Sequence, residues 1–215
     1  MIRFNEGARA ILNALDTFKS TPNVCSFISK TIYKCIAGDV QGAKKFSSNN
    51  VAKKLVSAIS LNKDCSDCCI ELCKTLWVSI AVDKTRENIN RALGADALNV
   101  LMQIATGGST DKQVGCACQV ISDILLFSDK AIMSFVQKGF VQQIFSVYDK
   151  YKDNEYIAGY FSTIVYALSQ TQNTPKELNC CGVIQILQDI IQRYRSNKHV
   201  VRYAYKALDL LGPLG

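Results

Sequence analysis

The stretch KTIYKCIAGD at residues 30–39 is nearly repeated as KTLWVSIAVD at residues 74–83. Both stretches begin with Lys-Thr, place an aromatic residue at the fourth position and end in Ile-Ala-x-Asp. The apolar segments around them start near residues 7, 50, 96, 140 and 182, so that the spacings are 43, 46, 44 and 42 residues. A regular period of this size is typical of repeat proteins, in which each unit buries its apolar face against its neighbours.

The apolar residues within each unit follow helical periodicity. In VIQILQDII, which begins at residue 183, they fall on one wide stripe of a helix. A longer apolar helix is then expected at 27–37, 68–82, 115–127, 156–168 and 200–211. Further short segments lead from each long helix into the next unit, at 42–48, 85–93, 130–139 and 175–181. Asp39, Asp83 and Asp129 precede three of these short segments, where a carboxylate can cap the N-terminus of a helix.

A short, a medium and a long helix in a period of this length resemble an armadillo repeat, and the resemblance covers nearly the whole chain. It implies an all-α fold, a right-handed α-solenoid of about four to five armadillo-type repeats, forming a single domain over residues 1–215. HEAT repeats, which have two helices per unit, are the structural alternative. The long helices are the third helices of the armadillo-type repeats. They line up side by side, and we expect them to form a ladder along one concave surface.

In armadillo proteins this ladder of third helices commonly holds an extended peptide, and the resemblance implies the same here. Cationic side chains can bind acidic groups of a partner, and aromatic rings supply rigid contact area. The predicted partner-binding residues are Lys30, Tyr33, Lys34, Lys74, Trp77, Tyr166, Arg202 and Tyr205. The alternatives are that the aromatic residues pack in the core and that the lysines are merely solvated.

The charge of the chain bears on the kind of partner. The Trp-x-x-x-Asn array of importin-α adaptors is missing, since the single tryptophan, Trp77, is followed four residues later by Ala81. The net charge is +7 and the expected groove is basic. We therefore expect a non-enzymatic adaptor or scaffold that binds a protein or extended peptide, preferably an acidic one, in a mode similar to that of β-catenin.

Two other functions stay open. A basic surface could attach the protein to acidic membrane lipid or nucleic acid, although the chain has no concentrated basic tail and nucleic acid is the less favoured partner. The residues of that surface would include Lys44, Lys45, Lys53 and Lys54. The third function is a zinc or redox sensor built from some of the ten cysteines.

Four of those cysteines lie close together in the sequence, at positions 65, 68, 69 and 73. Four thiolates spread along about 12 Å of helix cannot all reach one zinc ion, so we expect packing and no metal or other cofactor. The single histidine, His199, has no recognisable partner. The sequence GGST at 107–110 lacks the spacing of a phosphate-binding loop. We therefore expect no catalytic residue.

The sequence also bears on localisation and assembly. No apolar stretch approaches the roughly 20 residues that a membrane-spanning helix needs. The N-terminus has neither the apolar core of a signal peptide nor Gly at position 2, so we expect a cytoplasmic protein, with the nucleus as the alternative. The end at LLGPL, residues 210–214, has no obvious polar cap, so truncation of a longer array or a homodimer through this end is expected.

Overall fold

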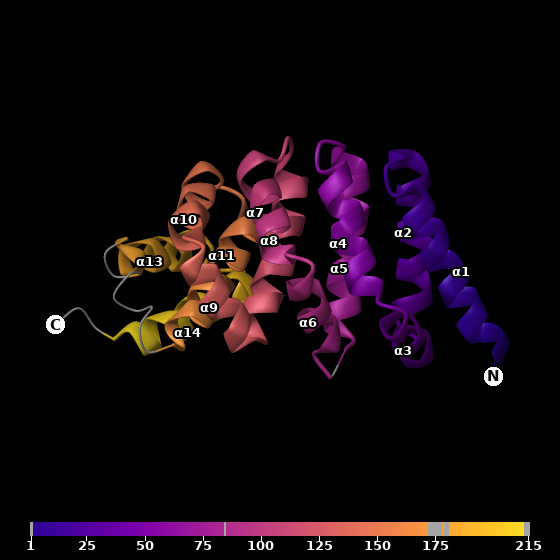
Figure 1. Ribbon diagram of the computed structural model, residues 1–215. Coiled ribbons are helices and arrows are strands. Elements are labelled where there is room, and N and C mark those ends of the chain that lie inside the picture. Colours follow the sequence, from indigo (N-terminus) through magenta and orange to yellow (C-terminus); the bar gives the residue numbers. More distant parts are fainter. Residues whose placement is uncertain (1, 84, 172–177, 179–180, 213–215) are drawn as a thin grey trace. The chain divides into compact units, whose positions relative to one another are not determined.

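The computed structural model describes residues 2–83, 85–171, 178 and 181–212, with side chains from residue 6 onward. Over these residues the chain forms α-helices and no strand, which confirms the all-α prediction (Figure 1). The chain divides into two compact units, Met1–Asp123 and Ile124–Gly215. The single domain expected over residues 1–215 stays a prediction. None of the helices described is both long enough and apolar enough to cross a bilayer.

Unit 1 begins with a pair of helices and continues with two triplets of a short, a medium and a long helix. The pair is α1 (Ile2–Phe18) and α2 (Pro22–Ile36). The first triplet is α3 (Val40–Ser48), α4 (Val51–Asn62) and α5 (Ser66–Ala81). The second is α6 (Glu87–Gly94), α7 (Ala97–Gly107) and α8 (Asp111–Leu126), whose last residues belong to unit 2.

Unit 2 contains a third triplet and the last pair of helices. The triplet is α9 (Asp129–Gln137), α10 (Phe140–Lys150) and α11 (Glu155–Ser169). The pair is α13 (Val183–Arg193) and α14 (Lys198–Leu211). The short helix predicted at 175–181 lies outside the described residues, except for Leu178 and Cys181.

The medium helices other than α1 each begin directly after a residue with left-handed backbone conformation. These residues are Asn50, Asp96, Gly139 and Gly182, with φ angles of 62°, 59°, 69° and 67°. Asn, Asp and Gly are the residues that adopt this conformation most readily. The chain can therefore turn sharply between the short and the medium helix. These turns coincide with the predicted repeat starts at 50, 96, 140 and 182 to within one residue.

The capping predictions for the short helices are partly confirmed. The carboxylate of Asp39 accepts a hydrogen bond of 2.9 Å from an N–H in the first turn of α3. That of Asp83 accepts one of 2.6 Å from an N–H in α6. The prediction for Asp129 is wrong, because α9 begins at this residue and the hydroxyl of Ser128 caps the helix instead.

The two units pack their third helices with different side chains. In unit 1, α2 packs against α5 through a buried hydroxyl pair, in which Ser29 Oγ donates to Thr75 Oγ1 at 2.9 Å. In unit 2, α11 packs against α14, where a glycine of α11 meets Val200. The ring of Phe161 on α11 is fully buried, stacks on Tyr148 at 4.5 Å between centroids and meets a second phenylalanine edge-on.

Candidate functional site

The third helices can be aligned by counting from the residue that precedes each of them. These preceding residues are Thr21, Cys65, Thr110, Asn154 and Asn197. Lys30, Lys74 and Lys206 each lie nine residues further on. Tyr33, Trp77 and Tyr166 each lie twelve residues further on. We call these places position 9 and position 12. Lys206 is clustered in the sequence with the predicted residues Arg202 and Tyr205, and the alignment shows that it is equivalent to Lys30 and Lys74.

On α2 the predicted residues are open to solvent. Lys30 and Lys34 are exposed, and the ring of Tyr33 is 36% exposed. None of the three makes an ion pair with another described residue. Phe27, one turn before Lys30, is 73% exposed. This face of α2 therefore offers two ammonium groups beside two aromatic rings, all of them available to a partner.

On α5 the equivalent residues are held by neighbouring acids. The ammonium of Lys74 donates to Glu71 Oε1 at 3.0 Å. The indole N–H of Trp77, which is half-buried, donates to Asp123 Oδ2 at 2.8 Å. Burial raises the pKa of the Asp123 carboxyl, and the hydrogen bond from the indole opposes that rise. Trp77 is thus neither a core residue nor a free one, and its polar edge is already bonded.

In unit 2 the predicted residue Tyr166 on α11 lies against α14. Its ring is 5.3 Å, between centroids, from that of Tyr203. The Lys206 ammonium lies 5.4 Å from the Tyr166 centroid and 5.3 Å from the Tyr203 centroid. The guanidinium carbon of Arg202 lies 5.6 Å from the Tyr203 centroid. These distances are in the range of cation–π contacts, and neither cation forms an ion pair with a described residue.

Tyr205, also predicted as a binding residue, takes no part in this cluster. Its ring is 53% exposed and lies eight residues after the cap of α14. The same place on α2 is occupied by Ser29, which faces the next third helix, α5. Tyr205 therefore lies on the side of α14 that a further repeat would cover.

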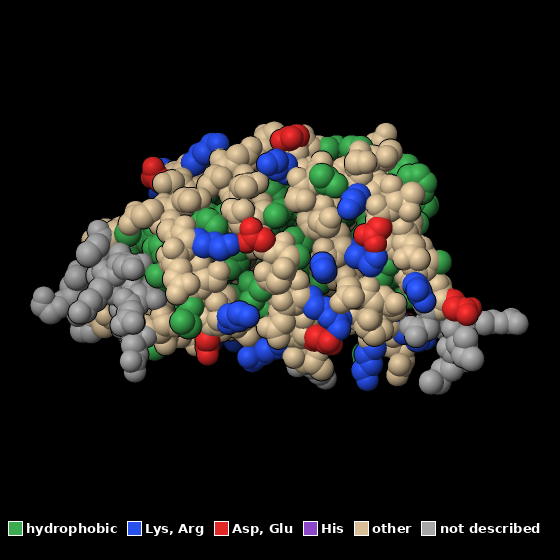
Figure 2. Space-filling model, in the orientation of Figure 1, with side chains coloured by type: hydrophobic (Ala, Val, Ile, Leu, Met, Phe, Trp, Pro, Cys, Tyr) green, Lys and Arg blue, Asp and Glu red, His purple; other side chains and the backbone are tan. Residues whose placement is uncertain are grey.

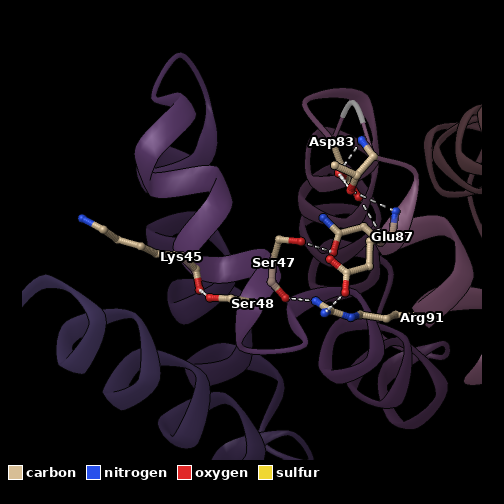
Figure 3. Close-up of polar contacts among 8 residues, drawn as sticks. Lys45, Ser47, Ser48, Asp83, Glu87 and Arg91 are labelled. Atoms are coloured by element: carbon tan, nitrogen blue, oxygen red, sulfur yellow. Dashed lines mark hydrogen bonds and ion pairs between the residues drawn. The ribbon is translucent and has the colours of Figure 1, made fainter. Parts of the chain in front are cut away.

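A separate hollow of about 630 Å³ is lined mainly by residues of α3 and α6 in unit 1. Figure 3 shows the polar contacts between these two short helices. The Arg91 guanidinium bonds to the Ser47 carbonyl and to the Glu87 carboxylate. The buried Asn88 amide accepts from the Ser47 hydroxyl at 3.0 Å and donates to a carbonyl of α5 at 2.8 Å. These polar groups bind one another and join α3 to α6. They therefore act as structural contacts between repeats.

The basic surface considered from the sequence also lies in unit 1. Figure 2 shows Lys and Arg side chains around α3 and α6, with acidic side chains among them. Lys44 and Lys53 are exposed, but Lys54 forms an ion pair with Asp16 of α1. Because acids are interspersed with the bases, this surface lacks the unbroken positive potential that phosphate backbones attract.

The cysteines are distributed between helices as small apolar side chains. Five are buried, namely Cys25, Cys68, Cys69, Cys73 and Cys118, and Cys180 lies outside the described residues. Among the residues described, no three His, Cys, Asp or Glu side chains are placed to hold a metal ion. Hydrogen bonds between neighbouring thiols shift their pKa values in opposite directions, raising that of Cys68 and lowering that of Cys25. Burial alone raises the pKa of Cys118 to about 12. A buried, protonated thiol such as that of Cys118 is a poor nucleophile and a poor metal ligand.

Comparison with known proteins gives structural neighbours only. An engineered protein matches 95% of this chain and 47% of its own length, with a TM-score of 0.77 and 19% identity. A designed armadillo repeat protein matches 95% of this chain and 82% of its own length, with a TM-score of 0.79 and 16% identity. Another designed armadillo repeat protein, in complex with peptide (KR)4, matches 95% and 81%, with a TM-score of 0.76 and 16% identity.

This chain thus spans about half the length of the first of these proteins and most of the other two. Neither a protein-family model nor a curated protein matches the sequence. At identities below one fifth, the likeness concerns the fold alone. Together with the triplets of short, medium and long helices, it establishes that the chain has an armadillo-type repeat fold, an all-α solenoid.

Proposed function

We propose that this protein is a non-enzymatic adaptor or scaffold that binds an extended acidic segment of another protein along its third helices. The observation that carries the proposal is the recurrence of a lysine at position 9 and an aromatic residue at position 12. Position 9 is a lysine in α2, α5 and α14, and position 12 is aromatic in α2, α5 and α11. Side chains that recur at one place on stacked repeats can contact successive residues of an extended peptide.

The structural neighbours support a peptide as the class of ligand, since they include armadillo repeat proteins designed for modular peptide recognition. One of them is in complex with peptide (KR)4, which is basic. The present chain offers lysines at position 9, so charge complementarity favours an acidic segment here. Lys30 has no acidic partner among the described residues, whereas Lys74 has Glu71. Lys30 should therefore contribute more to binding than Lys74.

The other candidate functions have less support. His199 is exposed at the start of α14, and its backbone N–H is bound by the capping Asn197. Nothing near it among the described residues suggests a catalytic base. The burial of Cys25, Cys68, Cys69, Cys73 and Cys118 disfavours a zinc or redox sensor built from them. Attachment to lipid or nucleic acid is disfavoured by the mixed charge around α3 and α6. The cytoplasmic location and a homodimer through an uncapped terminal repeat remain predictions.

The test is partner capture from cell lysate with variants of equal charge change. One double variant is Lys30→Glu with Lys74→Glu, which reverses the charge of both position 9 side chains in unit 1. The matched control is Lys44→Glu with Lys53→Glu, both exposed residues away from the third helices. Captured proteins are identified by mass spectrometry and by crosslinking.

We expect the wild type and the control to recover the same partner and the position 9 variant to lose it. The crosslinked segment of that partner should be acidic. Equal recovery by all three proteins would remove the third helices from the proposal. Loss with the control alone would favour attachment through the basic surface around α3.

A further inference from the structure

We infer that Tyr166, Tyr203 and Lys206 form a clamp that binds an anionic side chain, a carboxylate or a phosphate, of the partner segment. This inference rests on the proposed function and identifies one subsite of it. In the clamp Lys206 is the group that contacts the anion. The two tyrosines are positioning residues, because they act on the partner through the ammonium that they hold.

The geometry places one ammonium between two aromatic faces. Lys206 Nζ lies at almost equal distances, 5.4 and 5.3 Å, from the Tyr166 and Tyr203 centroids. The rings come from different helices, so the packing of α11 against α14 creates the arrangement. Attraction to two rings restricts a side chain that otherwise samples many rotamers. Less conformational entropy is then lost when a ligand binds.

The ammonium keeps its capacity to bind an anion. It carries three N–H donors, and a ring face attracts it electrostatically without satisfying a donor as strongly as a carboxylate does. No carboxylate of the described residues lies within ion-pair distance of it. The Lys206 side chain is half-buried and therefore reachable from solvent.

The charges along α14 favour the same ligand. Lys198, Arg202 and Lys206 follow one another at intervals of four residues, which places three cations on one side of the helix. Like charges at this spacing destabilise a helix by a few tenths of a kcal/mol per pair. None of the three forms an ion pair with a described residue. A bound anion would relieve this repulsion, whereas a cationic ligand would increase it.

A cage for a cationic side chain of the partner is the contrasting possibility, because two rings can also hold a foreign ammonium. Lys206 already fills that place in this protein. A partner lysine would have to displace it and would meet Arg202 beside the same ring. The charge and the occupancy of the site therefore favour an anion.

The test measures peptide binding to the purified full chain by fluorescence anisotropy at low ionic strength. The probes are labelled short peptides of alternating Glu and Ser, the same peptide with phosphoserine in place of Glu, and versions with Gln or Lys in place of Glu. We expect the Glu and phosphoserine peptides to bind and the Gln and Lys peptides not to bind. The stronger of the two binders identifies the anion that the clamp prefers.

Variants of the clamp separate the roles of its members. Lys206→Gln should weaken binding of the Glu peptide about fivefold, the effect of losing one exposed ion pair. Tyr203→Leu should weaken it about twofold to fivefold by freeing the ammonium. Tyr203→Phe keeps the ring and should bind like the wild type. Circular dichroism checks that each variant is folded, and Lys206→Gln, at a half-buried polar site, keeps the test valid if Tyr203→Leu does not fold.

Several outcomes would overturn the clamp. They are no binding of either anionic peptide by the wild type, unchanged binding after Lys206→Gln, or equal losses in Tyr203→Phe and Tyr203→Leu. Tighter binding of the Lys peptide after Lys206→Ala would identify a cation cage instead. Each of these can occur while capture of a partner still depends on Lys30 and Lys74. Failure of the clamp is therefore distinguishable from failure of the proposed function.

Discussion

The helix pair α2–α5 in unit 1 and the helix pair α11–α14 in unit 2 carry related side chains in different chemical settings. Both pairs combine a lysine at position 9 with an aromatic residue at position 12. In the first pair, Lys74 binds a glutamate and Trp77 binds an aspartate. In the second pair, Lys206 is held by two tyrosines and has no acidic partner among the described residues.

The comparison shows that equivalent positions in a repeat do not imply equal availability to a ligand. A lysine bound to a neighbouring carboxylate must lose that contact before it binds a partner. A lysine held by aromatic rings keeps its donors available. The same distinction separates Lys30, which has no ion pair with a described residue, from Lys74 within unit 1.

The largest expected effect concerns the aromatic packing that supports the unit 2 pair. Phe161→Ala should destabilise unit 2 by about 3–5 kcal/mol, because it removes a fully buried ring and leaves a cavity. Hydrogen exchange followed by mass spectrometry should show the loss of protection in α10, α11 and α14. The control is Tyr156→Ala on the same helix, where the ring is 66% exposed and the change should stay within about 0.5 kcal/mol. Equal effects of the two variants would contradict the assignment of Phe161 to the core.

The unit 1 pair should be sensitive to a hydroxyl rather than to a ring. Thr75→Val keeps the side-chain shape but removes a buried hydroxyl, which accepts from Ser29 Oγ and whose single hydrogen is within reach of two carbonyls. We expect a loss of about 1–2 kcal/mol in the free energy of unfolding, measured by urea denaturation. Thr31→Val, which removes only a local hydrogen bond on the open side of α2, should change it by less than about 0.5 kcal/mol. Equal losses would show that the buried pair does not join the helices.

The acid beside Trp77 should give unit 1 a distinctive dependence on pH. The pKa of Asp123 is raised above 3.8, so the folded protein binds its proton more tightly than the unfolded chain does. The stability that protonated Asp123 contributes is thus fully present below pH 3.8, the ordinary pKa of the carboxyl. It is lost as the pH rises through the raised pKa of the folded protein. Asp123→Asn, which can still accept from the indole, should therefore gain stability relative to the wild type at neutral pH and lose this advantage in acid.

Trp77→Phe provides the opposite change at the same site. It removes the hydrogen bond that lowers the pKa of Asp123, so this pKa should be higher in the variant than in the wild type. The loss of stability with rising pH should therefore extend to higher pH in the variant. Unfolding followed across acidic and neutral pH tests both variants. A pH dependence identical in all three proteins would show that the carboxylate is fully solvated.

The smallest expected effect is that of the exposed ion pair on α5. Lys74→Gln should change the free energy of unfolding by less than about 0.5 kcal/mol, since the two side chains are 37% and 24% exposed. Binding of an acidic peptide should suffer more from Lys30→Gln than from Lys74→Gln, because Lys30 has no internal ion pair to lose. Anisotropy titrations of the two variants compare them directly, and a larger loss for Lys74→Gln would contradict the comparison.

Much of the fold could be predicted from the sequence, because its signals are local. The apolar periodicity of each helix and the left-handed turns at Asn50 and Asp96 depend on neighbouring residues alone. Asp129 shows the limit of that reasoning. A carboxylate next to a serine gives two candidates for one helix cap. In the structure Ser128 has the extended backbone conformation of a cap residue, and its hydroxyl caps the helix.

The candidate site could be predicted only in part. Equivalent lysines and aromatic residues can be counted along the chain. That count puts Lys30 and Lys74 at position 9 and Tyr166 at position 12 of their helices. The pairing of Trp77 with Asp123 joins residues 46 positions apart, and no local pattern points to it. Tyr205 was predicted from its neighbours in the sequence, and the structure places its exposed side chain outside the cluster that Tyr203 and Lys206 form.

By itself the sequence determined that this chain forms helices, where they turn and how often the pattern recurs, because these properties follow from side-chain periodicity and backbone preferences. The tertiary structure decided which cations are paired with acids and which are held by rings. That outcome depends on the packing of third helices from neighbouring repeats, which brings together side chains more than 35 residues apart. Such contacts are set by geometry that a single segment does not contain.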